Sequence, residues 1–223
     1  MTTTPDTAPG AAAATPAGVR GRAPKTSGAP HGRAQVVPAV VRAATELFAT
    51  NGVGGISVRE IARQAGVNPA LIPRYVGDKD DIVTAVLVDL SKRVVEQIDH
   101  YVVESVADPQ RLPEPPPTME LYFRIATHLV VEGYDLDRHQ PDFPVVRRVV
   151  ELIGLQHGVD AAEARRRGAQ VFVLALGIEL FGSMLMHAAE LDPNDVEVQA
   201  TLRHAVHELS EAIASGQTAP RPP

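Results

Sequence analysis

The residues best suited to chemistry lie between Arg42 and Lys79, and the chemistry that they suit is contact with a polyanion. Asn68, Arg74 and Tyr75 bring amide, guanidinium and phenol groups into one short run. Arg74 can form a bidentate contact to guanine or neutralise a phosphate, and the sequence leaves both roles open. The stretch therefore predicts an interface with nucleic acid.

Such groups need a rigid element to position them, and the same stretch predicts two short helices joined by a tight turn. Ser57 and Glu60 have the spacing of a capping box, in which each side chain satisfies a free backbone N–H at a helix start. Gly66 can adopt the positive φ of a tight turn, and Asn68-Pro69 has the form of an N-cap followed by proline. This arrangement is typical of a helix-turn-helix, whose second helix enters the major groove, rather than of a plain structural hairpin.

The candidate DNA contacts are residues expected on the exposed face of the helix that follows Gly66, or near the starts and exposed faces of the neighbouring helices. They are Arg42, Ser57, Arg59, Asn68, Pro69, Ala70, Leu71, Arg74, Tyr75 and Lys79. Helix starts and cationic side chains are usual phosphate contacts. For Arg42, Ser57, Arg59 and Lys79, which lie outside that helix, the alternative is a solvated side chain. Ala62, Val67 and Ile72 are expected to face the core that the two helices share.

Charge is divided unevenly along the 223 residues, whose formal net charge is -6. Residues 1–80 carry nine Lys and Arg against five Asp and Glu, whereas residues 81–223 carry twelve against twenty-two. A basic head and an acidic body suit a protein that presents one end to a polyanion. The chain has no cysteine, which excludes disulfides, thiolate zinc sites and cysteine nucleophiles. It lacks a signal-peptide layout and an uninterrupted apolar run of about 20 residues, so we expect a cytoplasmic protein.

Apolar periodicity predicts an all-α chain with no strand of useful length. The first helix is expected from Val36 to a cap at Gly52, the second from Ser57 to about Ala65, and a short third from Pro69. The remaining helices are expected at about 79–106, 118–133, 143–156, 161–190 and 194–214. Residues 1–34, rich in Ala, Pro, Gly and Thr, predict a disordered basic tail that either tracks DNA or makes no defined contact, and residues 217–223 predict a second disordered tail.

The run LFATNGVGGISVREIARQAGVNPALIPRYVGDKDDIVTAVL resembles the TetR family of bacterial transcriptional regulators, and the match extends from residue 37 to about residue 88. The resemblance implies a homodimer with about nine helices, in which the last two helices form a four-helix bundle and the central helices enclose an inducer cavity. On that basis residues 35–80 are expected to be a helix-turn-helix DNA-binding domain, and residues 81–216 a helical effector-binding and dimerisation domain. The implied function is that of a repressor, released from a palindromic operator by a small-molecule effector.

The chain departs from the family pattern in the third helix. Pro73 stands where the family usually has a Tyr that touches a phosphate, Tyr75 stands at the usual His position, and Val76 replaces a usual Phe. Because proline lacks an N–H and strains a helix interior, Pro73 predicts a short or bent recognition helix.

An effector site would be a largely apolar cavity with a few polar groups. Candidates are aromatic, His and Met positions of the middle helices, each of which could instead be ordinary core. They are Tyr122, Phe123, His128, Phe143, Phe172, Phe181 and Met184, together with Tyr134 and His187. Gly168, Gly177 and Gly182 suggest a close approach of helices, either across a dimer or beside a cavity.

The sequence indicates neither an enzyme nor a cofactor or metal site. No glycine-rich phosphate loop follows a strand, and no serine nucleophile elbow or metal-ligand spacing is present. His204 and His207 are three residues apart and could supply half of a metal site, but without cysteines or clustered carboxylates nearby a surface histidine pair is the favoured interpretation. The competing interpretations are a DNA-binding activator or architectural protein, and a helical scaffold or interaction protein that has lost specific DNA reading.

Overall fold

The computed structural model describes residues 30–107 and 116–217, and all the regular structure in these ranges is helical. The helices are α1 (Arg33–Asn51), α2 (Val58–Ala65), α3 (Leu71–Tyr75), α4 (Lys79–Ala107), α5 (Pro117–Val131), α6 (Leu136–His139), α7 (Pro144–His157), α8 (Ala161–Ala188) and α9 (Val196–Ser215). The all-α prediction is confirmed, with most helix ends within two residues of their expected positions. The tails expected at 1–34 and 217–223 lie outside the described residues, except for their inner ends.

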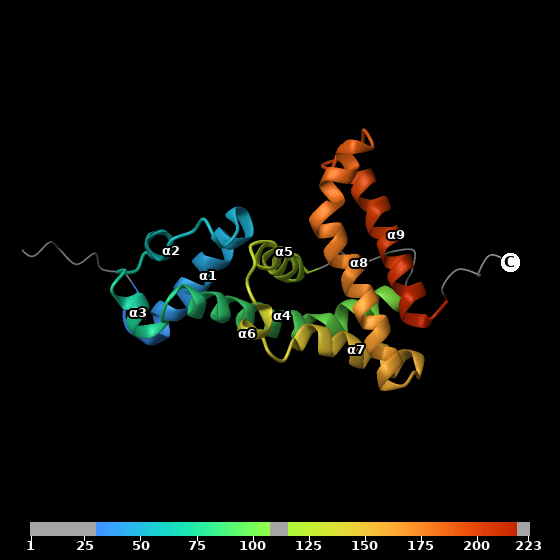
Figure 1. Ribbon diagram of the computed structural model, residues 1–223, viewed down its shortest axis with the longest axis horizontal. Coiled ribbons are helices and arrows are strands. Elements are labelled where there is room, and N and C mark those ends of the chain that lie inside the picture. Colours follow the sequence, from blue (N-terminus) through green and yellow to red (C-terminus); the bar gives the residue numbers. More distant parts are fainter. Residues whose placement is uncertain (1–29, 108–115, 218–223) are drawn as a thin grey trace, which may run out of the picture.

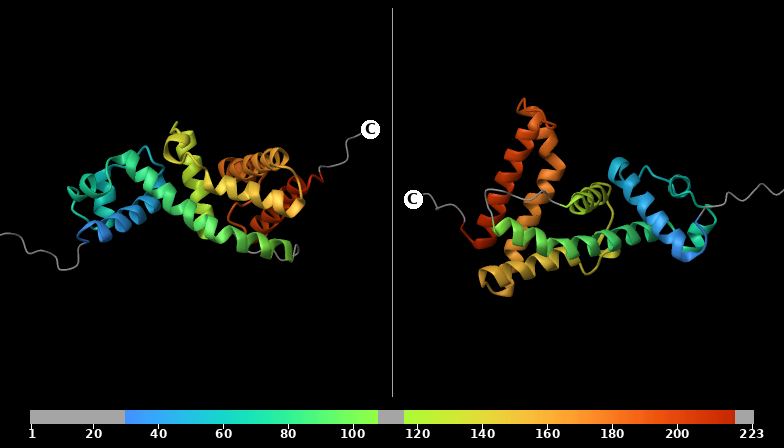
Figure 2. Two further views of the ribbon diagram at one scale, coloured as in Figure 1. Left: turned by 90° about the horizontal axis from the view of Figure 1, so that it is seen from below. Right: turned by 180° about the vertical axis from the view of Figure 1, so that it is seen from behind.

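The long helix α4 connects the two ends of the molecule. Helices α1 to α3 gather at the start of α4, whereas α7, α8 and α9 gather around its far half (Figure 1). Helix α5 lies between these groups and packs against α1, α4 and α8 (Figure 2). Buried residues of the head form one hydrophobic core with α4 and α5, in which Phe48 and Ile72 join Ile82, Leu90 and Ile125, and Val145 of α7 also belongs to it. The N-terminal head is therefore packed onto the body and is not a separate module on a linker.

Helix α2 starts and stops where the sequence predicts. The Ser57 side chain accepts a hydrogen bond from the Glu60 N–H at 3.2 Å, and the Glu60 carboxylate accepts one from the Ser57 N–H at 2.8 Å. The hydrogen bonds that the Glu60 carboxylate accepts from the Ser57 N–H and the Ser57 hydroxyl hold the pKa of Glu60 below its usual value. Gly66 ends the helix with a φ of 64°, a left-handed conformation that glycine adopts without strain. The predicted capping box and turn are confirmed.

Helix α3 begins at Leu71, two residues later than expected. Asn68 and Pro69 instead form the preceding turn, where their carbonyls accept hydrogen bonds from the N–H groups of Leu71 and Ile72 at 2.9 and 3.2 Å. Pro73 consequently falls in the first turn of the helix, where a missing N–H costs no intrahelical hydrogen bond. The helix has five residues, so the prediction of a short recognition helix is confirmed.

Two other starting points differ from the sequence prediction. Helix α1 begins at Arg33 instead of Val36, because an exposed polar turn extends the helix beyond its apolar periodicity. Helix α6 was not predicted, since four residues are too few to show a period. It is held by buried polar groups: His139 Nδ1 lies 2.9 Å from Thr84 Oγ1, and Gln140 accepts a hydrogen bond from the Tyr122 hydroxyl at 2.8 Å. Burial raises the pKa of Tyr122 to about 12.

Helix α8 is exceptionally apolar for an exposed helix. Within the described ranges it alone has the length and hydropathy of a membrane-crossing helix, and its apolar stretch is not buried in this chain. A single helix of this kind is weak evidence for a membrane span, because a face covered by another protein has the same composition.

Replacing Ser57 with Ala should lower the free energy of unfolding by about 1 kcal/mol, because the N-cap hydrogen bond of α2 is lost. Thr50→Ala is the matched control, since the exposed Thr50 hydroxyl bonds only to the carbonyl of Glu46 within α1. That variant should stay within about 0.5 kcal/mol of the unchanged protein. Urea unfolding followed by circular dichroism measures both, and equal losses in the two variants would contradict the capping role.

Candidate functional site

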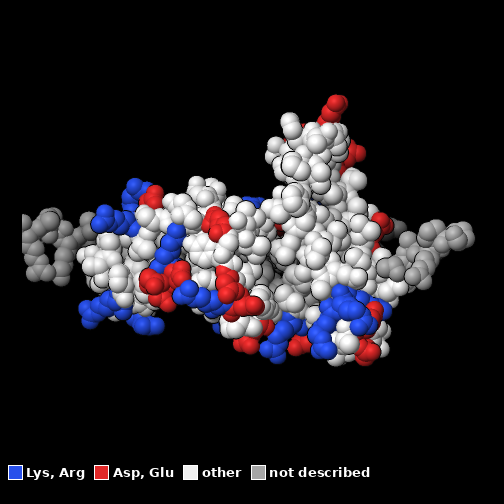
Figure 3. Space-filling model, in the orientation of Figure 1, with Lys and Arg blue, Asp and Glu red and all other residues white. Residues whose placement is uncertain are grey.

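The predicted DNA contacts lie on the N-terminal head, and most of them are exposed. Figure 3 shows Lys and Arg side chains around the end of the molecule that α1, α2 and α3 form. The exposed members of the predicted set are Arg42, Ser57, Arg59, Asn68, Pro69, Ala70 and Arg74. The surface thus offers cationic and hydrogen-bonding groups around the start of a short helix.

Leu71 and Tyr75 differ from the fully exposed residues expected at these positions. Both are half-buried and pack against the core, so their apolar parts anchor α3 to the head. Arg74 is exposed between them, with its guanidinium carbon 5.3 Å from the centre of the Tyr75 ring. Such a cation–π contact restrains the guanidinium without using its hydrogen-bond donors. No ion pair involves Arg74 within the described part of the chain, so those donors can serve a phosphate or a base.

Two of the predicted contacts already have partners inside the protein. The Ser57 hydroxyl donates to Glu60 at 2.7 Å as part of the α2 cap. Lys79, at the start of α4, donates from Nζ to the Gly54 carbonyl at 3.1 Å. Both residues therefore help to hold the α1–α2 loop and the start of α2 in place, whatever further contact they make.

The same loop is held on another side by a residue that sequence reasoning missed. The carboxylate of Glu132, at the end of α5, accepts hydrogen bonds from the N–H groups of Val53 and Gly54. The donor and acceptor residues are 79 positions apart for Val53, so no local pattern could have connected them. The only signal in the sequence was the glycine-rich character of the loop itself.

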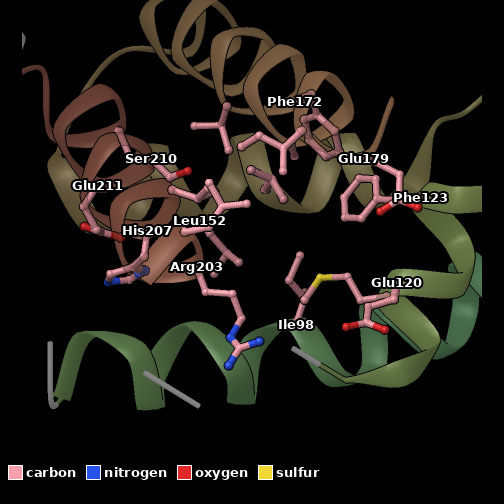
Figure 4. Close-up of a pocket in the computed structure, with 18 of the residues that line it drawn as sticks. Ile98, Glu120, Phe123, Leu152, Phe172, Glu179, Arg203, His207, Ser210 and Glu211 are labelled. Carbon is pink, nitrogen blue, oxygen red and sulfur yellow. The ribbon is translucent and has the colours of Figure 1, made fainter. Parts of the chain in front are cut away.

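A cavity of about 640 Å³ lies among α4, α5, α7, α8 and α9. Phe123 and Phe172 line one side, with ring centres 5.9 Å apart, and Leu152 of α7 also lines the cavity (Figure 4). His207 and Ser210 lie on the opposite side, on α9 (Figure 4). The cavity is therefore apolar along one side and carries polar groups from the last helix on the other.

Charged groups stand at the cavity's edges. Arg124 of α5 pairs with Glu179 of α8, with an N–O distance of 3.2 Å. Arg203 extends from α9 toward α4 (Figure 4) and has no ion pair with any described residue. Glu120 and Glu211 complete the charged lining. The mixture of both signs favours no single ligand charge.

Only Phe123 and Phe172 of the predicted effector residues line this cavity. Tyr122 is buried in the main core, and His128 lies beside Gly52, away from the cavity. Phe143 caps the start of α7 with a φ of 39°, whereas Phe181 and Met184 are exposed on α8. Sequence reasoning missed the apolar lining from α7 and the whole contribution of α9, because it could not tell which faces of these helices meet.

Several arginines of α7 and α8 form ion pairs within the protein. Arg166 and Arg167 pair with Glu163 on their own helix, and Arg148 of α7 pairs with Asp99 of α4 at 2.7 Å. The Arg148 guanidinium holds the pKa of Asp99 below its usual value. The described residues contain no group of three or more His, Cys, Asp or Glu side chains placed to hold a metal ion.

Comparisons with known proteins agree with the geometry of the head. The model of bacterial regulatory proteins of the tetR family matches residues 40–86, from α1 into α4. An HTH-type transcriptional repressor of Mycobacterium tuberculosis is 28% identical over 183 residues, covering 82% of this chain and 93% of the relative. A second HTH-type transcriptional regulator of that organism is 30% identical over 76 residues, covering 34% of this chain and 32% of the relative.

Solved structures share the fold beyond the matched head. A transcriptional regulator from Rhodococcus sp. Rha1 has a TM-score of 0.60 at 19% identity, covering 82% of this chain and 99% of that one. The multidrug binding protein EbrR, complexed with imidazole, has a TM-score of 0.53 at 16% identity, covering 84% of this chain and 96% of that one. The comparisons lead to one conclusion: residues 40–86 match the tetR family of bacterial regulatory proteins, and the chain is a DNA-binding transcriptional regulator.

Proposed function

We propose that this regulator is a cytoplasmic repressor, a homodimer that binds a palindromic operator and leaves it when a small molecule enters the cavity. The observation that carries the proposal is the connection between the two sites. Helices α4 and α5 line the cavity and also pack against α1 in the head. A change in the cavity therefore has a direct structural route to the DNA-binding surface. The name of the M. tuberculosis relative, a repressor, supports the direction of regulation.

The outer faces of α8 and α9 supply the proposed dimer interface. Large apolar side chains are exposed on these helices, including Val173, Leu180, Phe181, Met184, Leu185 and Leu209. Figure 3 shows few charges over the upper part of this helix pair. A Cβ added at Gly177 would meet no atom, and one at Gly182 would meet only Ile178 of its own helix. A second copy can approach closely at these glycines and cover the apolar face of α8.

The head supplies the proposed operator contacts. Two heads on one dimer would read major grooves about one or two helical turns apart, which requires a palindromic site. Arg74 contacts a base or a phosphate, and the exposed groups near the starts of α2 and α3 hold the DNA backbone. The Ser57 and Lys79 side chains act here chiefly by keeping the loop and helix starts in position.

The effector is proposed to be a mainly apolar small molecule. The cavity volume lies within the range of small-molecule sites, and the Phe123 and Phe172 rings offer an aromatic wall. Polar groups of the ligand would meet side chains such as His207 and Ser210 on α9. Binding requires no catalytic step by the chain.

Selection of binding sites from random duplex DNA by the purified full chain tests the proposal. An enriched palindrome that binds far more tightly than a scrambled control, with a steep dependence on salt, is the expected result. Equally weak binding to both DNAs would overturn the proposal and favour a helical scaffold. Binding that raises transcription of a reporter would identify an activator instead.

Arg74→Ala should weaken binding to the selected site by about 5- to 100-fold, because a direct base or phosphate contact is lost. Arg93→Ala is the matched control, since Arg93 is exposed on α4 and pairs with Asp89. Fluorescence anisotropy with labelled duplex measures the affinities, and light scattering checks that both variants keep the mass of the unchanged protein. Equal affinities for the two variants would remove Arg74 from the interface.

Phe181→Glu should convert the dimer to a monomer, because it places an unpaired carboxylate in the proposed apolar interface. Val88→Glu is the control: Val88 is 55% exposed on α4, compared with 47% for Phe181 on α8. Size-exclusion chromatography with light scattering gives the masses. A dimeric Phe181→Glu protein, or a monomeric Val88→Glu protein, would place the interface elsewhere.

A further inference from the structure

The Glu132 carboxylate is the principal side-chain link from α5 to the backbone of the DNA-binding head. Its two oxygens lie 3.0 and 3.1 Å from the Val53 backbone nitrogen, and Oε2 also accepts from the Gly54 N–H. Consecutive N–H groups that converge on one anion form a backbone nest. Hydrogen bonds to a carboxylate are stronger than hydrogen bonds between neutral groups. The contact therefore restrains the loop firmly although it involves only two N–H groups.

The loop is shaped to admit this carboxylate. A Cβ built on Gly52 would lie 2.2 Å from Glu132 Oε1, and one on Gly54 would lie 3.2 Å from Oε2. Gly52 also has a φ of 72°, which disfavours other residues. Between the two glycines, the Val53 side chain is fully buried in the core. The glycines thus leave room for the carboxylate, while Val53 fixes the loop to the head.

Helix α5 carries both this contact and part of the cavity wall. Phe123 and Arg124 line the cavity, and Glu132 follows at the end of the same helix. At 1.5 Å per residue, Phe123 and Glu132 are separated by about 14 Å along the axis. A helix of this length moves as a nearly rigid rod, so a displacement at the cavity reaches the loop. The loop leads directly into Ser57 and α2, the first helix of the helix-turn-helix.

We propose that Glu132 is the positioning residue through which the cavity controls the head. With the Glu132 contact made, the α1–α2 loop and α2 are held in register with α5. A ligand that shifts α5 pulls on or breaks the contact and so changes the placement of the helix-turn-helix relative to α4. The inference rests on the proposed function, because it assumes that cavity occupancy regulates DNA binding. It assigns that regulation to one carboxylate and two backbone N–H groups.

A double-mutant cycle tests the inference without a known ligand. Phe123→Ala perturbs the cavity end of α5, and Glu132→Gln weakens the loop contact while keeping the side chain's size. The four full-length proteins are the unchanged chain, each single variant and the double variant. Each is measured for affinity to the selected duplex and for amide hydrogen exchange at Val53 and Gly54. Glu96→Gln is the charge-matched control, since Glu96 lies on the exposed face of α4 and approaches only Lys92, at 4.0 Å.

The expected exchange result comes from the lost acceptor. A glutamine offers one acceptor oxygen where the glutamate offers two, so amide exchange at Val53 and Gly54 should rise on the order of tenfold in Glu132→Gln. Glu96→Gln should leave it unchanged. Phe123→Ala should raise exchange at these amides in the unchanged background, because the disturbance travels along α5. In the Glu132→Gln background, Phe123→Ala should raise amide exchange at Val53 and Gly54 by less than about twofold.

The DNA measurements should show the same dependence. Phe123→Ala should change operator affinity by about fivefold or more with Glu132 present, and by less than about twofold with Gln at that position. An undiminished effect in the Glu132→Gln background overturns the inference. The inference is also overturned if Phe123→Ala changes neither the amide exchange nor the operator affinity.

The two proposals can fail separately. If the unchanged chain selects no DNA site, the proposed function fails, while the exchange cycle still reports whether Glu132 connects α5 to the loop. If the chain selects a palindrome but the cycle shows independent effects, the repressor function stands and control passes through another contact.

Discussion

Burial of one face of α4 is the interaction on which the rest of the structure depends. Ile82, Val86 and Leu90 are fully buried there, and they are covered by the head on one side and by α5 on the other. Each such side chain contributes roughly 1.5–3 kcal/mol on removal from water. The head therefore shares its hydrophobic core with α4 and α5, and its orientation depends on how all of these elements pack.

Apolar packing sets the general position of the head, and a few directed contacts set its register. The hydrophobic effect has no preferred direction, so a packed helix can slide by fractions of an ångström at little cost. Hydrogen bonds, by contrast, weaken when the donor and acceptor shift by such distances, because they require a narrow range of length and angle. The Lys79 contact to Gly54 and the Glu132 contact to Val53 approach the α1–α2 loop from two different helices. The proposed control of the head by the cavity would act on these directed contacts, because they are more sensitive to a small displacement than the apolar packing is.

The sequence predicted local structure well and tertiary relations poorly. The cap at Ser57, the turn at Gly66 and the shortness of α3 follow from residues within a few positions of one another, so they could be derived in advance. The cavity depends on which faces of α5, α7, α8 and α9 meet, which periodicity alone does not determine. Phe123 and Phe172 were predicted because aromatic residues mark cavities, whereas Phe181 was predicted on the same grounds and is exposed. No local pattern pointed to Glu132, since its role depends on a loop 79 residues away.

The shortness of α3 limits how much DNA sequence one head can distinguish. Five helical residues span about 7.5 Å at 1.5 Å per residue, little more than two base-pair steps of 3.4 Å. Direct contacts from one such helix can specify only a few base pairs, which recur very often in any genome. In the proposed dimer, selectivity would come from the combination of two half-sites, the fixed distance between them and the stiffness of the DNA that joins them. The shortness of the helix thus makes the spacing of the site as informative as its base sequence.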